Sequence, residues 1–303
     1  MPIFLKSGGY RCRVYRSVFL HIIPIISTLC LRSALAQSFV DAEILVSDDC
    51  PTDAIKVICD KYVRFVQYSR NPNPGPESNV RRMVQIANGE YIKFLFDDDV
   101  LHPFCVQFLL EALDATRDRN TRLAFSPRHL IDDRNHTTGF INHFNASGDG
   151  LKMVSGRDFL RLTALNHVNL VGEYTTALFR KADAFDGDGQ FRLYRMEGDL
   201  FRGLIDLSAW VELAQLGDFV IHPKPLSYFR RHENATSNPQ INWKFIYAIT
   251  YYEDVLNFAF EKGYLPASDL PASYRNLVNT YRYWQNSFPQ LNARIAQIED
   301  ALT

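Results

Sequence analysis

The chain has 303 residues, of which 47% are hydrophobic and 22% are charged, and its formal net charge is −1. This composition is typical of one large domain, or one domain with an appendage, that has enough apolar side chains for a core. The charge balance argues against the basic surface of a nucleic-acid-binding protein. The five cysteines show no C-x-x-C pair and no metal-ligand spacing, which favours reduced thiols in a cytoplasmic protein.

The first 36 residues contain five Lys and Arg residues and no acidic residue. A basic region, the apolar run 18–31 and the segment Ala34-Leu35-Ala36 together have the layout of a secretory signal. The apolar run is too short for a membrane span and contains His21 and Pro24. The alternative interpretation is an opening strand followed by a helix that ends within residues 31–37.

From residue 42 onward, predicted strands alternate with predicted helices. We expect strands at residues 42–47, 63–68 and 91–96, and helices at 54–62, 79–87 and 104–116. Such alternation predicts an α/β fold with many parallel strands.

The second half of the chain has a less regular pattern. We expect a strand at 123–126, a loop or hairpin at 131–150, a loop and then a strand at 169–180, a helix beginning within 197–207, and a strand and turn at 219–229. From residue 242 the apolar residues follow helical spacing. The pattern over residues 274–302 predicts one amphipathic helix or a pair of helices.

Two clusters of aspartates follow predicted strands, Asp48-Asp49 and Asp97-Asp98-Asp99. Ligands of open α/β sheets bind beyond the carboxyl ends of the strands. Burying three adjacent carboxylates costs several kcal/mol unless a cation compensates their charge. Since Mg2+ and Mn2+ take oxygen ligands and keep substrate phosphates in their shell, we expect a carboxylate-held metal that neutralises a diphosphate.

The competing interpretation is that these aspartates only cap helices or form turns. A capping or turn role suffices for Asp53. For Asp48-Asp49 the capping role and the functional role are equally favoured. It accounts for one residue of the triplet Asp97-Asp98-Asp99 and leaves two unexplained, so a functional role is favoured there.

Five segments, in order along the chain, resemble family 2 glycosyltransferases of the GT-A fold. They are EILVSDDCPTD, NGEYI with FLFDDDVLHP, NLVGEYTTALFRK, EGDL and PLSYFRRHENATS. Cys50-Pro51 replaces the family's Gly-Ser, and Phe96 stands where many members have another Asp. The resemblance covers residues 31–237.

The resemblance implies a Rossmann-like GT-A fold with a mixed, mostly parallel sheet flanked by helices and a C-terminal helical extension. We expect a catalytic domain at 31–240, the helical extension at 241–303, and an atypical segment at 1–30. The family's opening strand and its Thr-Tyr-Asn element have no full match in that segment. Either residues 13–20 replace the strand or the start of the chain is aberrant.

The resemblance also implies roles for individual residues. Asp199 would be the general base that takes the proton of the acceptor hydroxyl. Asp98 would be the first choice as metal ligand and Asp99 the second. His232 is either a metal or phosphate partner or part of a solvated basic turn. The side chains expected to bind the nucleotide-sugar are Asp48, Asp49, Asp97, Arg230 and Arg231.

The function that follows is an inverting, metal-dependent transfer of sugar from a nucleotide-diphosphate donor, with a UDP-sugar favoured, to a glycan, lipid-linked or protein acceptor. We expect Mn2+ or Mg2+ as cofactor, no nucleic-acid partner, and a cytoplasmic protein that associates with a membrane, if at all, peripherally. Two alternatives remain. A haloacid-dehalogenase-like phosphohydrolase also places Asp-x-Asp after a strand, and the atypical N-terminus suits a non-catalytic glycosyltransferase relative.

Overall fold

The computed structural model describes residues 18–22, 28–39, 41–195, 204–233 and 242–302. Strand β1 (Val18–Ile22) pairs in parallel with β2 (Ile44–Asp48), which pairs in parallel with β3 (Val66–Arg70). Helix α1 (Thr28–Leu35) buries Cys30, Leu31 and Ala34. The N-terminal region thus supplies an opening strand and helix, and β1 begins inside the range 13–20 expected for a replacement strand.

Three helices alternate with the strands of this first half, as the sequence predicts. They are α2 (Ala54–Asp60), α3 (Pro76–Ile86) and α4 (Cys105–Ala115). Helix α3 starts with a proline, whose missing N–H costs nothing in the first turn, and it buries Val80, Met83 and Val84 at helical spacing. Strand β3 ends two residues later than expected, at Arg70.

A mixed sheet of five strands forms the centre of the molecule. Its order is β4 (Tyr91–Lys93), β10 (Ala177–Arg180), β6 (Thr121–Phe125), β11 (Asp218–Ile221) and β9 (Lys152–Val154). Strands β6 and β11 run parallel, whereas β10 is antiparallel to both β4 and β6. Strand β4 is shorter than the predicted 91–96, because residues 94–96 run on without a ladder partner toward the acidic triplet.

A smaller sheet brings distant parts of the chain to that triplet. It has the order β5 (Val100–Leu101), β12 (Ser227–Arg230), β7 (Arg128–Ile131) and β8 (Thr137–Ile141). Of the two alternatives left open for residues 131–150, the structure forms a hairpin, since β7 and β8 pair antiparallel. Because β12 pairs with β5, the residues that follow β12 lie beside the triplet that precedes β5.

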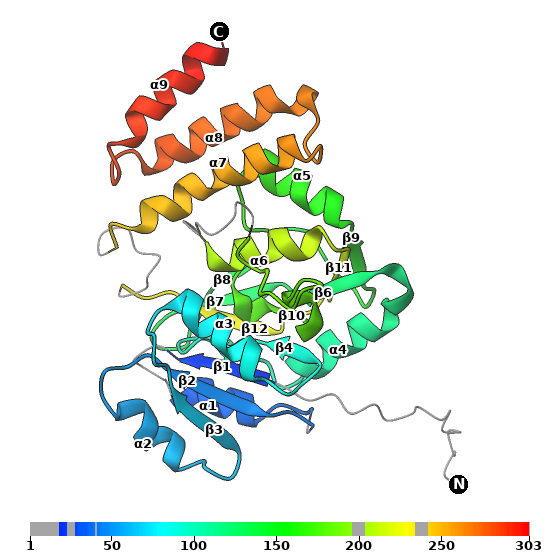
Figure 1. Cartoon of the computed structure of the whole chain (residues 1–303), viewed down its shortest axis with the longest axis vertical. Helices are drawn as coiled ribbons and strands as arrows, with labels where there is room; N and C mark the ends of the chain where they lie inside the picture. The colour runs from blue at the N-terminus through cyan, green and yellow to red at the C-terminus, as the bar shows by residue number, and fades with distance from the viewer. Residues whose placement is uncertain (1–17, 23–27, 40, 196–203, 234–241, 303) are drawn as a thin grey trace.

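Helices cover the central sheet and extend the molecule at its C-terminal end. Helices α5 (Gly156–Asn166) and α6 (Ile205–Ala214) lie against the sheet, and α7 (Phe245–Glu261), α8 (Leu270–Trp284) and α9 (Leu291–Leu302) stack at the end opposite the β1–β3 sheet (Figure 1). The predicted tail is therefore a pair of helices. No helix within the described ranges is both long and apolar enough to cross a membrane.

Because α5 packs closely against the end of α6, a methyl group added at Gly156 should strongly reduce the stability of the protein. A Cβ on Gly156 would lie 2.0 Å from the carbonyl oxygen of Ala214 and 2.5 Å from that of Gly217. We expect Gly156→Ala to lower the free energy of unfolding in urea by about 1–3 kcal/mol, because backbone atoms must move. Gly150→Ala is the matched control, since nothing lies within 4 Å of its Cβ position. Equal stability of the two variants would contradict this packing.

Candidate functional site

The three aspartates that follow β4 have different environments. Asp99 is fully buried, and its Oδ1 accepts a hydrogen bond of 3.0 Å from the backbone N–H of Arg230. Burial, helped by the negative charges of Asp98 and Glu173, raises the pKa of Asp99 well above its usual range. Asp97 and Asp98 are half-buried. The structure therefore turns the second-choice metal residue, Asp99, into the interior and leaves the first choice, Asp98, at the surface.

Asp98 and His232 form a pair although they lie far apart in the sequence. Oδ2 of Asp98 lies 3.0 Å from Nε2 of His232, and their side chains are 27% and 24% exposed. Both are thus accessible to a ligand and close enough to hold one cation together. No group of three or more His, Cys, Asp or Glu side chains suited to a metal ion occurs in the described parts of the chain. A cation here would take its remaining ligands from substrate and water.

The side chain of Arg230 binds acceptors within the protein, whereas the sequence predicts that it binds a diphosphate. Its Nε donates to the carbonyl oxygen of Asp98 at 2.8 Å, one terminal nitrogen donates to the carbonyl of Asp132, and the other donates to Oδ1 of Asn135 at 2.7 Å. The side chain is buried and its donors are used within the protein. Arg231 is exposed, so it is the member of the pair whose side chain could reach an anion.

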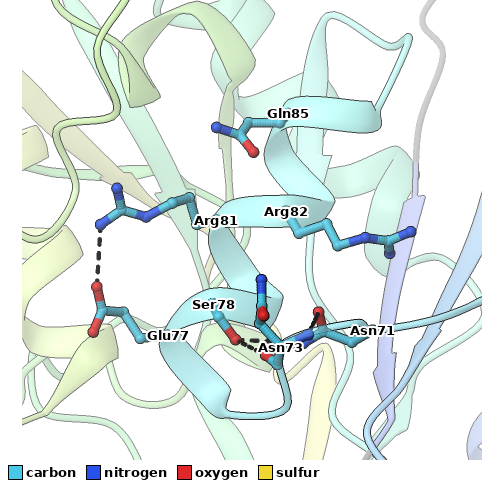
Figure 2. A pocket seen from close by; sticks show the side chains of 7 residues that line it. All are labelled: Asn71, Asn73, Glu77, Ser78, Arg81, Arg82 and Gln85. Carbon is cyan, nitrogen blue, oxygen red and sulfur yellow. Dashed lines mark hydrogen bonds and ion pairs between the residues drawn. The ribbon is translucent and has the colours of Figure 1, made fainter.

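A pocket lies beyond the end of β3, along one side of α3. Figure 2 shows its lining, which consists of Asn71, Asn73, Glu77, Ser78, Arg81, Arg82 and Gln85. Arg82 turns toward the strands and donates to the hydroxyls of Ser47 and Ser69 at 3.2 and 2.9 Å. The pocket thus adjoins the carboxyl ends of β2 and β3, which is the edge where the sequence predicts the nucleotide.

Asp49 connects β2 to this pocket. Its two carboxylate oxygens accept hydrogen bonds from the Asn71 side chain at 2.8 Å and from the backbone N–H of Gly75 at 3.0 Å. These bonds hold the segment between β3 and α3 in place. Asp49 therefore lies at the expected edge of the sheet, where it positions the pocket wall.

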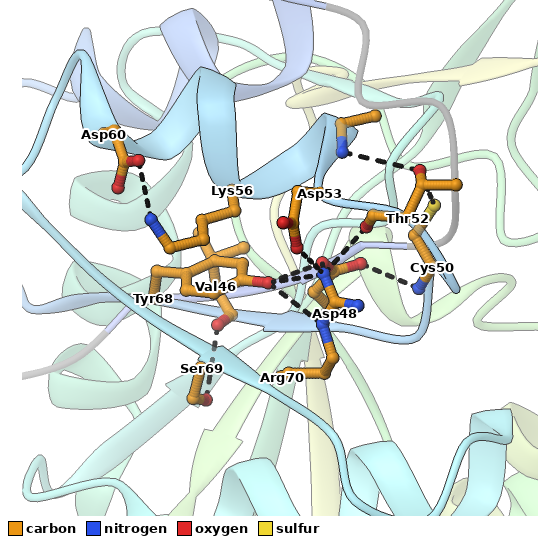
Figure 3. Close-up of polar contacts among 11 residues, drawn as sticks. Val46, Asp48, Cys50, Thr52, Asp53, Lys56, Asp60, Tyr68, Ser69 and Arg70 are labelled. Atoms are coloured by element: carbon orange, nitrogen blue, oxygen red, sulfur yellow. Dashed lines mark hydrogen bonds and ion pairs between the residues drawn. The ribbon is translucent and has the colours of Figure 1, made fainter.

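Asp48 is fully buried in a network that neutralises its charge (Figure 3). Oδ1 accepts from the backbone N–H of Cys50 at 2.7 Å, and Oδ2 accepts from the Tyr68 hydroxyl at 2.7 Å and from Arg70 at 3.4 Å. Arg70 also pairs with Asp53 at 2.8 Å. A carboxylate with these partners requires no cation, so the electrostatic case for a metal applies to the triplet and not to Asp48-Asp49.

A second acidic group, not identified from the sequence, lies near the triplet. Glu173 forms an ion pair of 2.6 Å with the buried Arg128, and Asp206 lies in the first turn of α6. Burial, with the negative charge of Glu173 as the second cause, raises the pKa of Asp206 to about 7. The charge of Glu173 also acts on Asp99. Glu173 therefore links this group electrostatically to the aspartates of the triplet.

Gly172 is the sequence signal that could have revealed this group. Its φ of +99° is rare for residues with side chains, and a Cβ there would lie 2.4 Å from the guanidinium of Arg128. Its carbonyl accepts from the Trp210 indole at 2.9 Å. The resemblance includes this glycine segment, but only the fold shows that it packs on Arg128. The predicted base, Asp199, lies outside the described residues.

The different environments of the two neighbouring arginines give a testable contrast. We expect Arg230→Gln to lower the free energy of unfolding by about 1–3 kcal/mol, because several acceptors lose their donor. Arg231→Gln should stay within about 0.5 kcal/mol of the parent, as is usual for exposed positions. Urea denaturation measures both. A stable Arg230→Gln protein would contradict the structural role of Arg230.

Comparisons with known proteins show the family of the chain. Residues 28–199, more than half of the chain, match the Glycosyl transferase family 2 profile. Uncharacterized protein MT1568 of Mycobacterium tuberculosis is 30% identical over 217 residues, which cover 70% of this chain and 65% of that protein. Succinoglycan biosynthesis protein ExoO of Rhizobium meliloti is 36% identical over 89 residues, 28% of this chain and 25% of that protein. The matched segment is thus less than two thirds of the length of either relative.

Solved structures of S. aureus TarS residues 1–349 have a similar fold. The complex with UDP-GlcNAc gives a TM-score of 0.52 at 16% identity, covering 92% of this chain and 83% of that chain. The complex with UDP gives 0.53 at 14% identity, with 94% and 83% coverage. This likeness confirms the GT-A-type fold expected from the sequence. Together with the profile match, it shows that the chain belongs to glycosyl transferase family 2.

Proposed function

We propose that this chain transfers a sugar from a nucleotide-diphosphate donor, with a UDP-sugar favoured, to a glycan, lipid-linked or protein acceptor. The transfer is metal-dependent and inverts the anomeric configuration. The observation that carries the proposal is the accessible pair Asp98–His232, whose carboxylate and imidazole lie 3.0 Å apart. The TarS complexes with UDP and UDP-GlcNAc support the choice of donor, and the succinoglycan role named for ExoO supports a glycan acceptor.

The side chains of the site fit a divalent cation. Asp98 offers carboxylate oxygens and His232 an imidazole nitrogen, and the preceding residue Asp97 is half-buried. A nitrogen ligand suits Mn2+ better than the harder Mg2+. When bound, the cation supplies positive charge against the diphosphate of the donor. The exposed Arg231 would add a positive charge near the same oxygens.

A general base must take the proton of the acceptor hydroxyl in an inverting displacement. Asp199 remains the base proposed from the resemblance. Among the described residues, Asp206 is a second candidate: it is half-buried, it lies within electrostatic reach of Glu173 and Arg128, and burial raises its pKa to about 7. A base with a pKa near the working pH combines a useful fraction of the ionised form with a strong affinity for the proton.

The two alternatives to a working transferase lose support from the same observations. A haloacid-dehalogenase-like reaction uses the aspartates of an Asp-x-Asp motif after its strand, whereas Asp99, the second aspartate of that motif here, is fully buried and accepts a hydrogen bond from the backbone N–H of Arg230. The non-catalytic alternative was motivated by the atypical N-terminus. Strand β1 is present and paired with β2.

The metal site predicts a defined pattern of binding. We expect Mn2+ to strengthen UDP binding to the parent protein, and Asp98→Asn and His232→Ala each to remove most of that gain, because each deletes a ligand. Thermal stabilisation by UDP, with and without Mn2+, measures the effect. Asp133→Asn serves as a control at an exposed aspartate outside the site. If both ligand variants keep the full Mn2+ effect, the metal does not lie between these side chains.

Paired amide substitutions identify the base. If Asp206 is the base, Asp206→Asn retains UDP binding and loses metal-dependent hydrolysis of the donor, whereas Asp199→Asn keeps both. Since the raised pKa leaves Asp206 protonated in acid, the rate should fall as pH drops below about 7 and level off above it. The opposite result, with Asp199→Asn inactive and Asp206→Asn active, would return the role to Asp199.

A further inference from the structure

Thr175 joins the segment before β10 to the loop that carries the acidic triplet. The antiparallel ladder between β4 and β10 ends where Lys93 pairs with Leu178, and the same register, continued, sets Phe96 opposite Thr175. There a side chain takes over from the ladder, because the hydroxyl of Thr175 accepts a hydrogen bond of 3.3 Å from the backbone N–H of Phe96. The carbonyl of Thr175 accepts from the ammonium of Lys93. Two polar groups of this buried residue therefore hold residues 93–96.

The hydroxyl of Thr175 also lies close to the buried aspartate of the triplet. Burial and the charge of Asp98 raise the pKa of Asp99, and the hydroxyl of Thr175 is the largest of the interactions that oppose this shift. Asp99 also accepts from the backbone N–H of Arg230, whose side chain binds the carbonyl of Asp98. The loop is therefore anchored at two points, by Thr175 at Phe96 and by Arg230 farther along.

The residues just before Thr175 lead to the acidic group at the start of α6. Tyr174 is fully buried, and its hydroxyl donates to the carbonyl of Ile205 at 3.2 Å. Ile205 immediately precedes Asp206 in the first turn of α6. Glu173, the next residue back along the chain, acts on Asp206 through its charge. Three consecutive residues thus connect the loop of the triplet to the first turn of α6.

We propose that Thr175 is a positioning residue, whose hydroxyl fixes the spacing between the metal-held donor and the base that activates the acceptor. This inference rests on the proposed transferase function, with Asp98 as metal ligand and Asp206 as base. A displacement of about 1 Å between reacting groups can lower a rate on the order of 100-fold. Because Arg230 holds the loop independently, loss of the hydroxyl should spare donor binding and loosen the spacing to the base.

Amide exchange tests the anchor without turnover. NMR of isotope-labelled protein follows the exchange of the Phe96 amide with solvent deuterium. Thr175→Val has nearly the same shape but no hydroxyl, so we expect it to quicken this exchange by about tenfold or more. Thr175→Ser keeps the hydroxyl and should stay within about threefold of the parent. Unchanged exchange in Thr175→Val overturns the proposal.

Steady-state kinetics tests the consequence of the anchor. In Mn2+-dependent hydrolysis of UDP-GlcNAc and UDP-glucose, we expect Thr175→Val to lower kcat by about tenfold and to change KM by less than about twofold. Thr175→Ser should restore kcat. The matched control is Thr121→Val, because Thr121 is fully buried at the start of β6 and its hydroxyl donates to the carbonyl of Thr116 at 2.9 Å. This control should lose stability in urea without a lower kcat.

The results distinguish a failure of this inference from a failure of the function on which it rests. An active parent whose kcat is unchanged in Thr175→Val overturns the positioning role, and so does a fall in kcat that Thr121→Val shares. The transferase proposal fails separately if the parent shows neither metal-dependent hydrolysis nor stabilisation by UDP and Mn2+, while the Thr175 variants change the exchange of the Phe96 amide as expected.

Discussion

The buried guanidinium of Arg230 is the interaction on which the candidate site depends. It joins the loop after β4, through the carbonyl of Asp98, to the β7–β8 turn, through Asp132 and Asn135, while its own backbone N–H binds Asp99. One side chain thus fixes three segments that are distant in the sequence. Because this arrangement turns Asp99 inward, the carboxylate of Asp98 is left at the surface beside His232.

The aspartates at this end of the fold differ in how their charge is compensated. The carboxylate of Asp48 receives a tyrosine hydroxyl, an arginine and a backbone N–H, so it is satisfied within the protein. Among the described residues, the side chain of Asp98 pairs with His232 alone, and both side chains are accessible. Acidity alone therefore does not distinguish a ligand site from a structural network. The number of hydrogen-bond donors that the protein itself supplies to each carboxylate distinguishes the two. An aspartate with few such donors is stabilised most by a cation.

Much of the fold follows from local sequence. Periodicity and breakers place the helices and strands of the first half within a few residues, and the resemblance identifies the family. Contacts between distant segments lie beyond local reasoning. The β12–β5 pairing that brings Arg230 to the triplet depends on sheet topology, so the sequence alone does not show that this side chain binds Asp98, Asp132 and Asn135. The sequence does not reveal the raised pKa of Asp206 either, because that shift arises from burial and from Glu173, which is distant in the sequence.

The central claim is that Asp98 and His232 hold a cation against the phosphates of a nucleotide. The most direct measurement is an anomalous difference map, at the manganese absorption edge, from crystals grown with UDP and Mn2+. The account predicts one peak about 2.0–2.3 Å from a carboxylate oxygen of Asp98 and from Nε2 of His232, with diphosphate oxygens in the same shell. UDP bound with its diphosphate held by side chains alone, or a manganese peak away from both residues, would contradict it.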